Sequence, residues 1–270
     1  MNELERKMVD QLRDLRENHH VIGVKAEFEA EGTRMEEAVR LKDVVSTAGL
    51  GLTMKVGGGE ALRDMYEARV IGVERVVGPM IESQYALHKF LAAAKLAFPT
   101  GERDDVKFAV NIETITAVDN FESMLTLAEI GELDGVVLGR VDMTGSLGLS
   151  RDDVNCPEIL DISRRVFANA KAAGMECAIG GGVGKEALPF MRELGDLLDR
   201  YETRKVIFGC PPALEDDAEA GILKAVGFEL MWLKNKRDFY GSIYEEDRTR
   251  IEMLEARYAR LIEKAGGMLQ

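Results

Sequence analysis

Apolar positions along the chain follow two spacings, the compact runs of buried strands and the three-to-four-residue repeat of amphipathic helices. Leu4, Met8, Leu12 and Leu15 recur at helical spacing and predict an N-terminal helix over residues 4–15. Seven compact apolar runs then predict strands over 21–28, 50–56, 74–81, 107–113, 134–139, 175–180 and 205–209. Helical spacing between the runs predicts helices over 32–48, 60 to the early seventies, 85–97, 157–174 and 185–200, and a further amphipathic segment between 113 and 134.

An eighth strand is predicted over residues 227–234, GFELMWLK. Eight alternations of strand and helix are typical of an α/β fold, the closed (β/α)8 TIM barrel, whose site lies at the carboxyl ends of the strands. If residues 227–234 were helical, an open doubly wound sheet would be the alternative. No repeat or proline-rich linker divides the sequence. We therefore expect a single domain over 1–270, with an N-terminal helix over 1–20, a barrel over 21–236 and a C-terminal helical extension over 237–270.

The last predicted helix has a continuous apolar face. Its residues Ile251, Leu254, Tyr258, Leu261 and Ile262 lie on one side. We expect this apolar stripe to be buried, either against the barrel of the same chain or against a partner subunit. We expect a homo-oligomer, although packing within one subunit would bury the same stripe.

Length and charge narrow the class of protein. A chain of 270 residues suits one α/β barrel, for which about 250 residues is typical. The formal net charge of -13 disfavours nucleic acid or an anionic membrane as a partner, because both attract basic surfaces. Cys156, Cys177 and Cys210 lack metal-finger spacing, and the mixed charges of the N-terminus do not suit a signal peptide. We expect a soluble cytoplasmic protein.

Carboxylates follow two consecutive predicted strands. Glu113 and Thr114 end the strand over 107–113, and Asp142 and Thr144 follow the strand over 134–139. Because parallel strands joined by a helix point the same way, both carboxylates fall on one face of the sheet. Hard divalent cations prefer such oxygen ligands. The pair predicts a metal site.

The other predicted strand ends add charged groups but no histidine. They supply Glu27, Glu29, Lys55, a glycine run over 180–184, and Cys210 with two prolines. Acidic ligands without imidazole favour Mg²⁺ or Mn²⁺ over zinc. Such an ion leaves positions for a chelating 2-oxo acid, and chelation stabilises an enolate. The glycine run would allow a phosphate to approach, but a tight strand-to-helix turn explains it as well.

Two motifs carry a resemblance to a known family. The segments VNIETITAVDNFESML and ELDGVVLGRVDMTGSLG are similar to the paired motifs of the HpcH/HpaI aldolase and citrate lyase β family, within the phosphoenolpyruvate/pyruvate-binding TIM barrels. The match is specific over about forty residues. GPMIES before it and PEILDISRRVFANAKAAGM after it extend a weaker similarity over roughly residues 21–210.

The resemblance implies roles for individual residues. Glu113 and Asp142 match the family's metal-binding carboxylates. The backbone from Gly139 through Arg140 and Val141 would lie against the substrate carboxylate. Lys55 falls where the family generally has an arginine that holds the keto oxygen of the substrate, and lysine supplies the charge without the bidentate fork.

Two further residues belong to the expected substrate site. Thr114, beside the metal pair, is expected to contact the substrate, as is Arg140. The Arg140 side chain has two interpretations, an anchor for a distal phosphate or carboxylate and a salt bridge to a neighbouring glutamate.

The segment AEFEAE departs from the family pattern. Family aldolases have Asp-Gly-Glu-His there, and the citrate lyase branch has Asp-Leu-Glu-Asp. Alignment puts Glu27 at the aspartate, Glu29 at the glutamate and Ala30 at the histidine. Either Glu27 or Glu29 then acts as the base with a shifted pKa, or the reaction differs from that of the common aldolases.

The sequence thus predicts a metal-dependent carbon–carbon lyase or aldolase that acts on a small 2-oxo acid through a pyruvate-type enolate. The other substrate would be an aldehyde that is sugar-like in its hydroxyl content, because the strand ends are polar. Two alternatives stay open. One is citrate-lyase-like acyl-CoA cleavage or phosphoenolpyruvate-dependent transfer, and the other is a barrel that binds a metabolite without catalysis.

Overall fold

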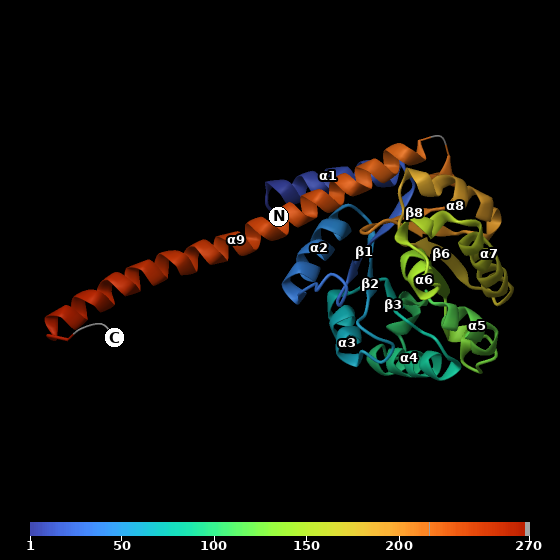
Figure 1. Cartoon of the computed structure of the whole chain (residues 1–270), viewed down its shortest axis with the longest axis horizontal. Helices are drawn as coiled ribbons and strands as arrows, with labels where there is room; N and C mark the ends of the chain where they lie inside the picture. The colour runs from blue at the N-terminus through green and yellow to red at the C-terminus, as the bar shows by residue number, and fades with distance from the viewer. Residues whose placement is uncertain (216, 268–270) are drawn as a thin grey trace. The chain divides into compact units, whose positions relative to one another are not determined.

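The computed structural model describes residues 1–215 and 217–267, and its centre is a closed barrel of eight strands in sequence order. The helices that flank the barrel form a ring around it (Figure 1). The strands are β1 (Val21–Glu27), β2 (Gly51–Lys55), β3 (Arg75–Gly78), β4 (Lys107–Ile112), β5 (Gly135–Gly139), β6 (Glu176–Gly180), β7 (Arg200–Glu202) and β8 (Val206–Gly209).

The helices alternate with the strands as the apolar spacing predicts. They are α1 (Glu3–Asn18), α2 (Met35–Thr47), α3 (Leu62–Ile71), α4 (Gln84–Ala97), α5 (Ile115–Met124), α6 (Arg140–Ser146), α7 (Pro157–Ala172), α8 (Leu188–Leu194) and α9 (Ala218–Lys264). Short 3-10 turns span Arg103–Asp105, Ile130–Glu132, Arg151–Asn155, Lys185–Ala187, Gly195–Leu197 and Pro212–Leu214. The predicted α/β class and closed barrel are confirmed, and the open sheet is excluded.

The carboxyl ends of seven strands, β1 to β7, lie at the same mouth of the barrel. Each pair from β1–β2 through β6–β7 is parallel, whereas β8 runs antiparallel to both β7 and β1. Residues 203–205 join β7 to β8 as a hairpin at this mouth. Cys210, predicted at the carboxyl end of a strand on this mouth, lies instead at the opposite end of the barrel, because β8 is reversed.

The predicted seventh and eighth strands are corrected by the structure. Arg200, which the spacing places in the helix over 185–200, begins β7, and residues 227–234 belong to α9 instead of a strand. Three buried residues are too short a run to show a strand period. In the segment GFELMWLK the buried side chains Phe228 and Trp232 are four residues apart, which is the helical spacing.

The interior of the barrel combines a small apolar layer with buried charges. Val77, Ala109, Val137 and Ala178 form one cluster, and their small side chains leave room above them. Towards the amino ends of the strands, Glu176 accepts hydrogen bonds from Arg75 at 2.7 Å and from Lys107 and Arg200. Burial would raise the pKa of Glu176, but these cations outweigh it and lower the pKa to about 2.

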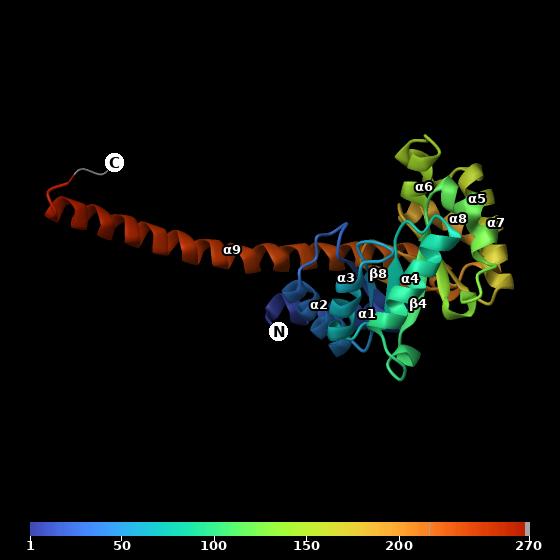
Figure 2. The same cartoon turned by 90° about the horizontal axis from the view of Figure 1, so that it is seen from below.

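The chain divides after Glu229 into two compact units, and α9 begins in the first and continues into the second. Figure 2 shows α9 as one unbroken helix. The predicted C-terminal helical extension over 237–270 is thus helical through Lys264, but its helix begins at Ala218. The single domain stays a prediction.

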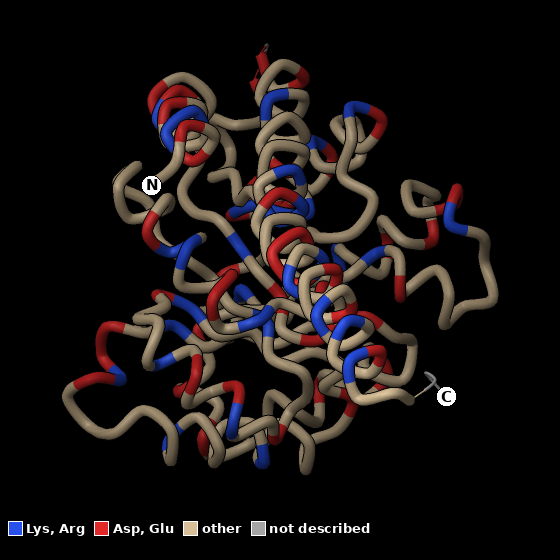
Figure 3. Tube along the Cα trace, turned by 90° about the vertical axis from the view of Figure 1, so that its left-hand side faces the viewer, with Lys and Arg blue, Asp and Glu red and all other residues tan. Residues whose placement is uncertain are grey.

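Charged residues of both signs are interspersed along the trace (Figure 3). The expectation that nucleic acid and anionic membranes are not partners stays a prediction. Among the described helices, none has the length and continuous apolar character needed to cross a membrane.

Candidate active site

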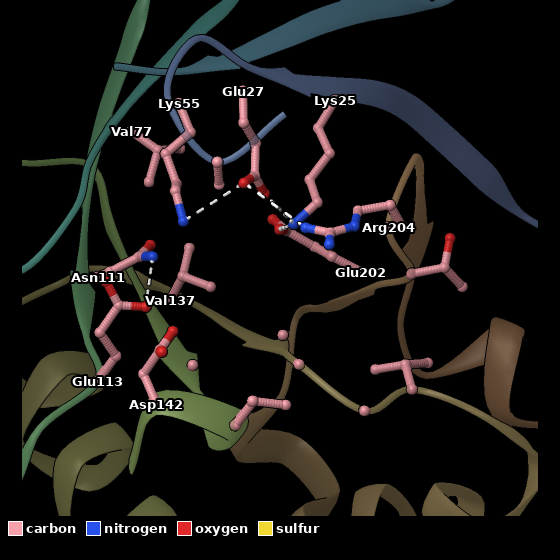
Figure 4. Close-up of a pocket in the computed structure, with 18 of the residues that line it drawn as sticks. Lys25, Glu27, Lys55, Val77, Asn111, Glu113, Val137, Asp142, Glu202 and Arg204 are labelled. Carbon is pink, nitrogen blue, oxygen red and sulfur yellow. Dashed lines mark hydrogen bonds and ion pairs between the residues drawn. The ribbon is translucent and has the colours of Figure 1, made fainter. Parts of the chain in front are cut away.

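A cavity of about 650 Å³ opens at the carboxyl ends of the strands. Figure 4 shows polar side chains from opposite walls of the barrel pointing into it. Those that line it include Lys25, Glu27, Thr53, Lys55, Asn111, Glu113, Asp142, Arg151, Glu202 and Arg204. The glycines of the β6–α8 loop, 180–182 and 184, form part of the wall, so backbone replaces side chains there.

The predicted metal pair comes together in this cavity. Glu113, directly after β4, is 2% exposed, whereas Asp142, in the first turn of α6, is exposed. Figure 4 shows the two carboxylates on the same side of the cavity. Burial raises the pKa of Glu113, and the charge of Asp142 adds to that rise, although the Lys55 ammonium and hydrogen bonds from Met80 and Asn111 oppose it.

The surrounding chain fixes the Glu113 carboxylate. Its Oε1 accepts the backbone N–H of Met80 at 3.1 Å, and its Oε2 accepts Nδ2 of Asn111 at 2.9 Å. Met80 has a φ of 51°, a strained conformation for a non-glycine residue that persists where its surroundings hold it. A Cβ atom at Gly139 would lie 2.5 Å from Glu113 Oε2, so this position of the carboxylate requires glycine.

Cations surround the buried carboxylate of Glu27 on β1. Lys25 Nζ lies 3.4 Å from its Oε1, and Lys55 Nζ and Arg204 Nη1 lie 3.6 and 3.8 Å from its Oε2. Burial raises the pKa of Glu27, but the charges of Lys25, Lys55 and Arg204 together outweigh burial and lower it. Glu27 is therefore an ionised anchor for the ammonium of Lys55.

Glu202 completes this charge cluster from β7. Its Oε2 lies 3.1 Å from Lys25 Nζ, and its Oε1 lies 3.8 Å from Arg200 Nε. Burial lowers the pKa of Lys25, but the nearby Glu202 and Glu27 outweigh burial and raise it. Lys25 is thus held as a cation between two carboxylates.

Two of the predicted site residues, Glu29 and Thr114, do not line the cavity. Glu29 is exposed and does not line the cavity. Thr114 caps α5 by accepting the N–H of Ala117 at 3.1 Å, and its hydroxyl donates to Glu82 at 2.5 Å. Their side chains are directed to the helix cap and the surface, whereas Gly139 and Val141 do line the cavity.

The Arg140 side chain is fully buried and supports the cavity wall from behind. Its guanidinium donates to the carbonyl of Gly181 at 2.7 Å and to Asn155 Oδ1 at 2.5 Å, and stacks over Phe190. Burial lowers the pKa of Arg140 to about 10. Neither predicted role of this side chain, a distal anion anchor or a salt bridge to a glutamate, agrees with these partners. It holds the glycine loop in place.

Four residues of the networks around Glu27 and Glu113 were missed from the sequence: Lys25, Asn111, Glu202 and Arg204. Lys25 and Asn111 each lie two residues before a predicted site carboxylate on the same strand, so the two-residue period of a strand was the signal that would have found them. Glu202 and Arg204 belong to β7 and its hairpin, which the predicted helix over 185–200 and the loop after it obscured.

Two carboxylates of the cavity, Glu113 and Asp142, are suitable ligands for a divalent ion. In the described part of the chain, no three His, Cys, Asp or Glu side chains converge as a metal cluster. Glu113 and Asp142 alone are the one or two carboxylates that Mg²⁺ typically takes from a protein, with water and substrate as its other ligands. Burial and the charge of Asp142 raise the pKa of Glu113, so a bound cation would stabilise the ionised form of this carboxylate. The residues fit the ion.

The fold and this cavity define an α/β-barrel protein with a polar site where enzymes of this fold have their active sites. The family model described as HpcH/HpaI aldolase/citrate lyase matches residues 35–180. The chain belongs to this family, which comprises lyases and aldolases whose members generally depend on a divalent metal.

Solved structures share the fold at low sequence identity. An HpcH/HpaI aldolase from Desulfitobacterium hafniense DCB-2 has a TM-score of 0.56 at 15% identity, covering 70% of this chain and 80% of that chain. A family protein from Burkholderia cenocepacia J2315 has a TM-score of 0.55 at 18% identity, with coverages of 70% and 90%. A variant of the citrate synthase SbnG has a TM-score of 0.55 at 13% identity, with coverages of 85% and 90%. A search of curated proteins finds no match.

Proposed function

We propose that the protein is a divalent-metal-dependent carbon–carbon lyase or aldolase that acts on a small 2-oxo acid through a pyruvate-type enolate. The observation that carries the proposal is the grouping of Glu113, Asp142 and Lys55 at one cavity. Two carboxylates and one ammonium around a polar cavity match the needs of a reaction in which negative charge develops on a carbonyl oxygen.

Glu113 and Asp142 would hold Mg²⁺ or Mn²⁺, as the resemblance to the family implies. When bound, the ion would polarise the keto group of the substrate and stabilise the enolate charge. Asn111 and the N–H of Met80 orient Glu113 through hydrogen bonds of 2.9 and 3.1 Å. Such partners behind a ligand fix its position and tune its affinity.

Lys55 would supply positive charge where the enolate oxygen forms. Its side chain is 21% exposed, so water screens the charge little. The ammonium is a point charge and cannot donate the two parallel hydrogen bonds of a guanidinium. This difference distinguishes the site from one with the family's arginine. Glu27 holds the ammonium from one side at 3.6 Å and leaves its other N–H bonds for the substrate.

The lowered pKa of Glu27 bears on the choice of base. A general base works best with a pKa near the working pH. Burial raises the pKa of Glu27, but the charges of Lys25, Lys55 and Arg204 outweigh burial and lower this pKa, away from the working pH. Glu27 suits the positioning of Lys55 better than strong proton abstraction. This observation favours a second candidate of the same enolate type, phosphoenolpyruvate-dependent transfer, because transfer of the phosphoryl group to water frees the enolate without removal of a carbon-bound proton.

The test is pyruvate release from a panel of 4-hydroxy-2-oxo acids, with and without Mn²⁺. We expect activity that requires the ion and that falls at least about 100-fold in Glu113→Gln and Asp142→Asn. Asp161→Asn, a change at a 77% exposed carboxylate on α7, is the matched control and should retain full activity. Metal-independent activity, or full activity in both site variants, would refute the proposal.

Calorimetric titration with Mn²⁺ and oxalate, a mimic of the enolate, separates the alternatives. Oxalate binding that needs the ion, together with turnover only of phosphoenolpyruvate, supports the second candidate, whereas turnover only of an acyl-CoA supports citrate-lyase-like cleavage. Absence of metal-dependent oxalate binding would favour a barrel that binds a metabolite without catalysis.

A further inference from the structure

Helix α9 presents a long row of exposed apolar side chains. Among the described residues it carries eleven large apolar side chains that are at least 45% exposed. Nine of them, each 52–71% exposed, follow one line along the helix: Leu223, Val226, Leu230, Leu233, Tyr244, Ile251, Leu254, Tyr258 and Leu261. A contiguous apolar surface of this kind on a soluble protein marks an interaction site.

The row has the period of a coiled coil. Its steps alternate between three and four residues without a break from Leu223 to Leu261 once Arg237, Tyr240 and Asp247 are included. This is the heptad pattern, in which two positions of every seven face a partner helix. We call these twelve positions the α9 seam. Ile243 and Met253, also exposed, lie off it.

The two charges in the seam identify the partner. Arg237 and Asp247 lie at equal distances on either side of Ser242, so a second copy of α9 that runs in the opposite direction brings each arginine opposite an aspartate. The same alignment matches all the other seam positions: Leu223 with Leu261, Val226 with Tyr258, Leu230 with Leu254, Leu233 with Ile251, and Tyr240 with Tyr244.

We propose that two copies of this chain associate through α9 as an antiparallel coiled coil, with a two-fold axis at Ser242. The axis lies one residue from Gly241, the midpoint of the helix Ala218–Lys264, so the two helices overlap almost completely. A parallel pair would instead place Arg237 on Arg237 and Asp247 on Asp247. Like charges that meet in a desolvated seam oppose association, whereas opposite charges there select one register.

Basic residues beside the seam do not decide the orientation. Arg248 and Arg250 would face lysines of the second copy in the antiparallel pair. Each already has acidic partners in its own helix, Glu245 and Glu252 for Arg248 and Glu246 for Arg250, at 2.6–3.2 Å. These groups are more than half exposed, so their repulsion across the pair is screened.

The outer layers of the seam reach the site of the first copy. Val226 lines the cavity and is 52% exposed. The antiparallel alignment places Tyr258 of the second copy against it. The second copy would therefore close one edge of the cavity, which is a reason for the association besides burial of the apolar row.

Sedimentation equilibrium of the full chain tests the association. We expect a dimer or a multiple of it, and Ile251→Asp should weaken association on the order of 100-fold, because a charge would be desolvated in the seam. Met253→Asp, an equally exposed change two residues away and off the seam, is the matched control and should associate like the unaltered chain. Circular dichroism verifies that both variants stay folded. A monomeric chain, or equal effects of the two changes, would overturn the proposal.

A charge exchange tests the orientation. Arg237→Asp and Asp247→Arg should each weaken association about 10-fold, since each creates like charges in the seam, and the double variant should return to within about 3-fold of the original. In a parallel pair the double variant would still stack like on like. Failure of the double exchange to restore association would overturn the antiparallel arrangement.

Discussion

Replacing Gly139 with alanine should disturb the Glu113 carboxylate without touching any charge. The new Cβ would lie 2.5 Å from Oε2 and 2.9 Å from Cβ of Glu113, both far inside normal contact. The backbone at Gly139, with φ of -87° and ψ of 93°, is open to alanine, so the effect comes from packing alone. Oε2 must move by roughly 1 Å to reach ordinary contact distance.

The cost can be worked from what that movement breaks. Oε2 accepts Asn111 Nδ2 at 2.9 Å, a buried hydrogen bond to a charged group whose loss costs about 1.5–3 kcal/mol. The new Cβ would also lie too close to Cβ of Glu113, which cannot move as freely as the carboxylate. This contact adds an overpacking cost of about 1–3 kcal/mol, and the displacement of Glu113 lowers part of that cost. We expect a total loss of about 2–4 kcal/mol in the free energy of unfolding.

Urea unfolding followed by circular dichroism measures this loss, and titration with Mn²⁺ measures the second effect. If Glu113 is a metal ligand, its displacement should weaken Mn²⁺ binding at least about 10-fold. Gly145→Ala is the control, because a Cβ there meets nothing within 4 Å and alanine favours the helix. Unchanged unfolding and unchanged Mn²⁺ binding in Gly139→Ala would refute the packing argument.

Three further changes test the network around the cavity. Glu27→Gln should lower kcat for pyruvate release about 10- to 100-fold by releasing Lys55, and an unchanged rate would contradict that role. Arg140→Met should lower the free energy of unfolding, measured by urea titration, by about 2–4 kcal/mol, because the Gly181 carbonyl and Asn155 lose a buried donor. Glu176→Gln should lower the free energy of unfolding by about 2–4 kcal/mol. The effect is smaller than for a fully buried ion pair, because the side chain is 33% exposed. The folded pKa of Glu176, about 2, lies below its ordinary value, so its contribution is present above pH 4.5 and is lost as the pH falls from 4.5 towards 2. Acid unfolding of Glu176→Gln that retains this pH dependence would contradict the assignment.

The sequence predicts the barrel because most of its strands are long enough to show their own pattern. The runs that end at Lys55, Glu113 and Gly139 are compact and buried, and the helix after each of them buries apolar side chains. β7 has three residues and two of them are charged, so its burial arises from the closed barrel and leaves no local pattern. The apolar pattern of a long strand can be read from its own residues, whereas the burial of Arg200 and Glu202 depends on the strands that close the barrel around them.

The same distinction separates the two halves of the predicted site. Glu113 and Asp142 follow consecutive strands within one strand–helix–strand unit, so local spacing suffices to place them together. Two partners of Glu27 are local, Lys25 on the same strand and Lys55 opposite it on β2, whereas Arg204 comes from the hairpin after β7. The Arg204 contact depends on closure of the barrel. Spacing alone therefore left Glu27 and Glu29 equivalent, and only burial distinguishes them.

The ion pairs inside the barrel give a physical reason for the unusual residues at this site. Lys55, Glu27, Lys25 and Glu202 follow one another at 3.6, 3.4 and 3.1 Å, and Arg200 continues the series at 3.8 Å. Opposite charges alternate along it, so each buried group is compensated by its neighbours, whereas a single buried charge would be costly. A neutral histidine at the position of Ala30 would add no charge to this series, but Glu27 in place of the family aspartate extends a longer carboxylate towards Lys55. Under the proposed function, the longer carboxylate and the lysine would form one exchange, in which a pair of residues would hold the charge that a single arginine supplies in the family.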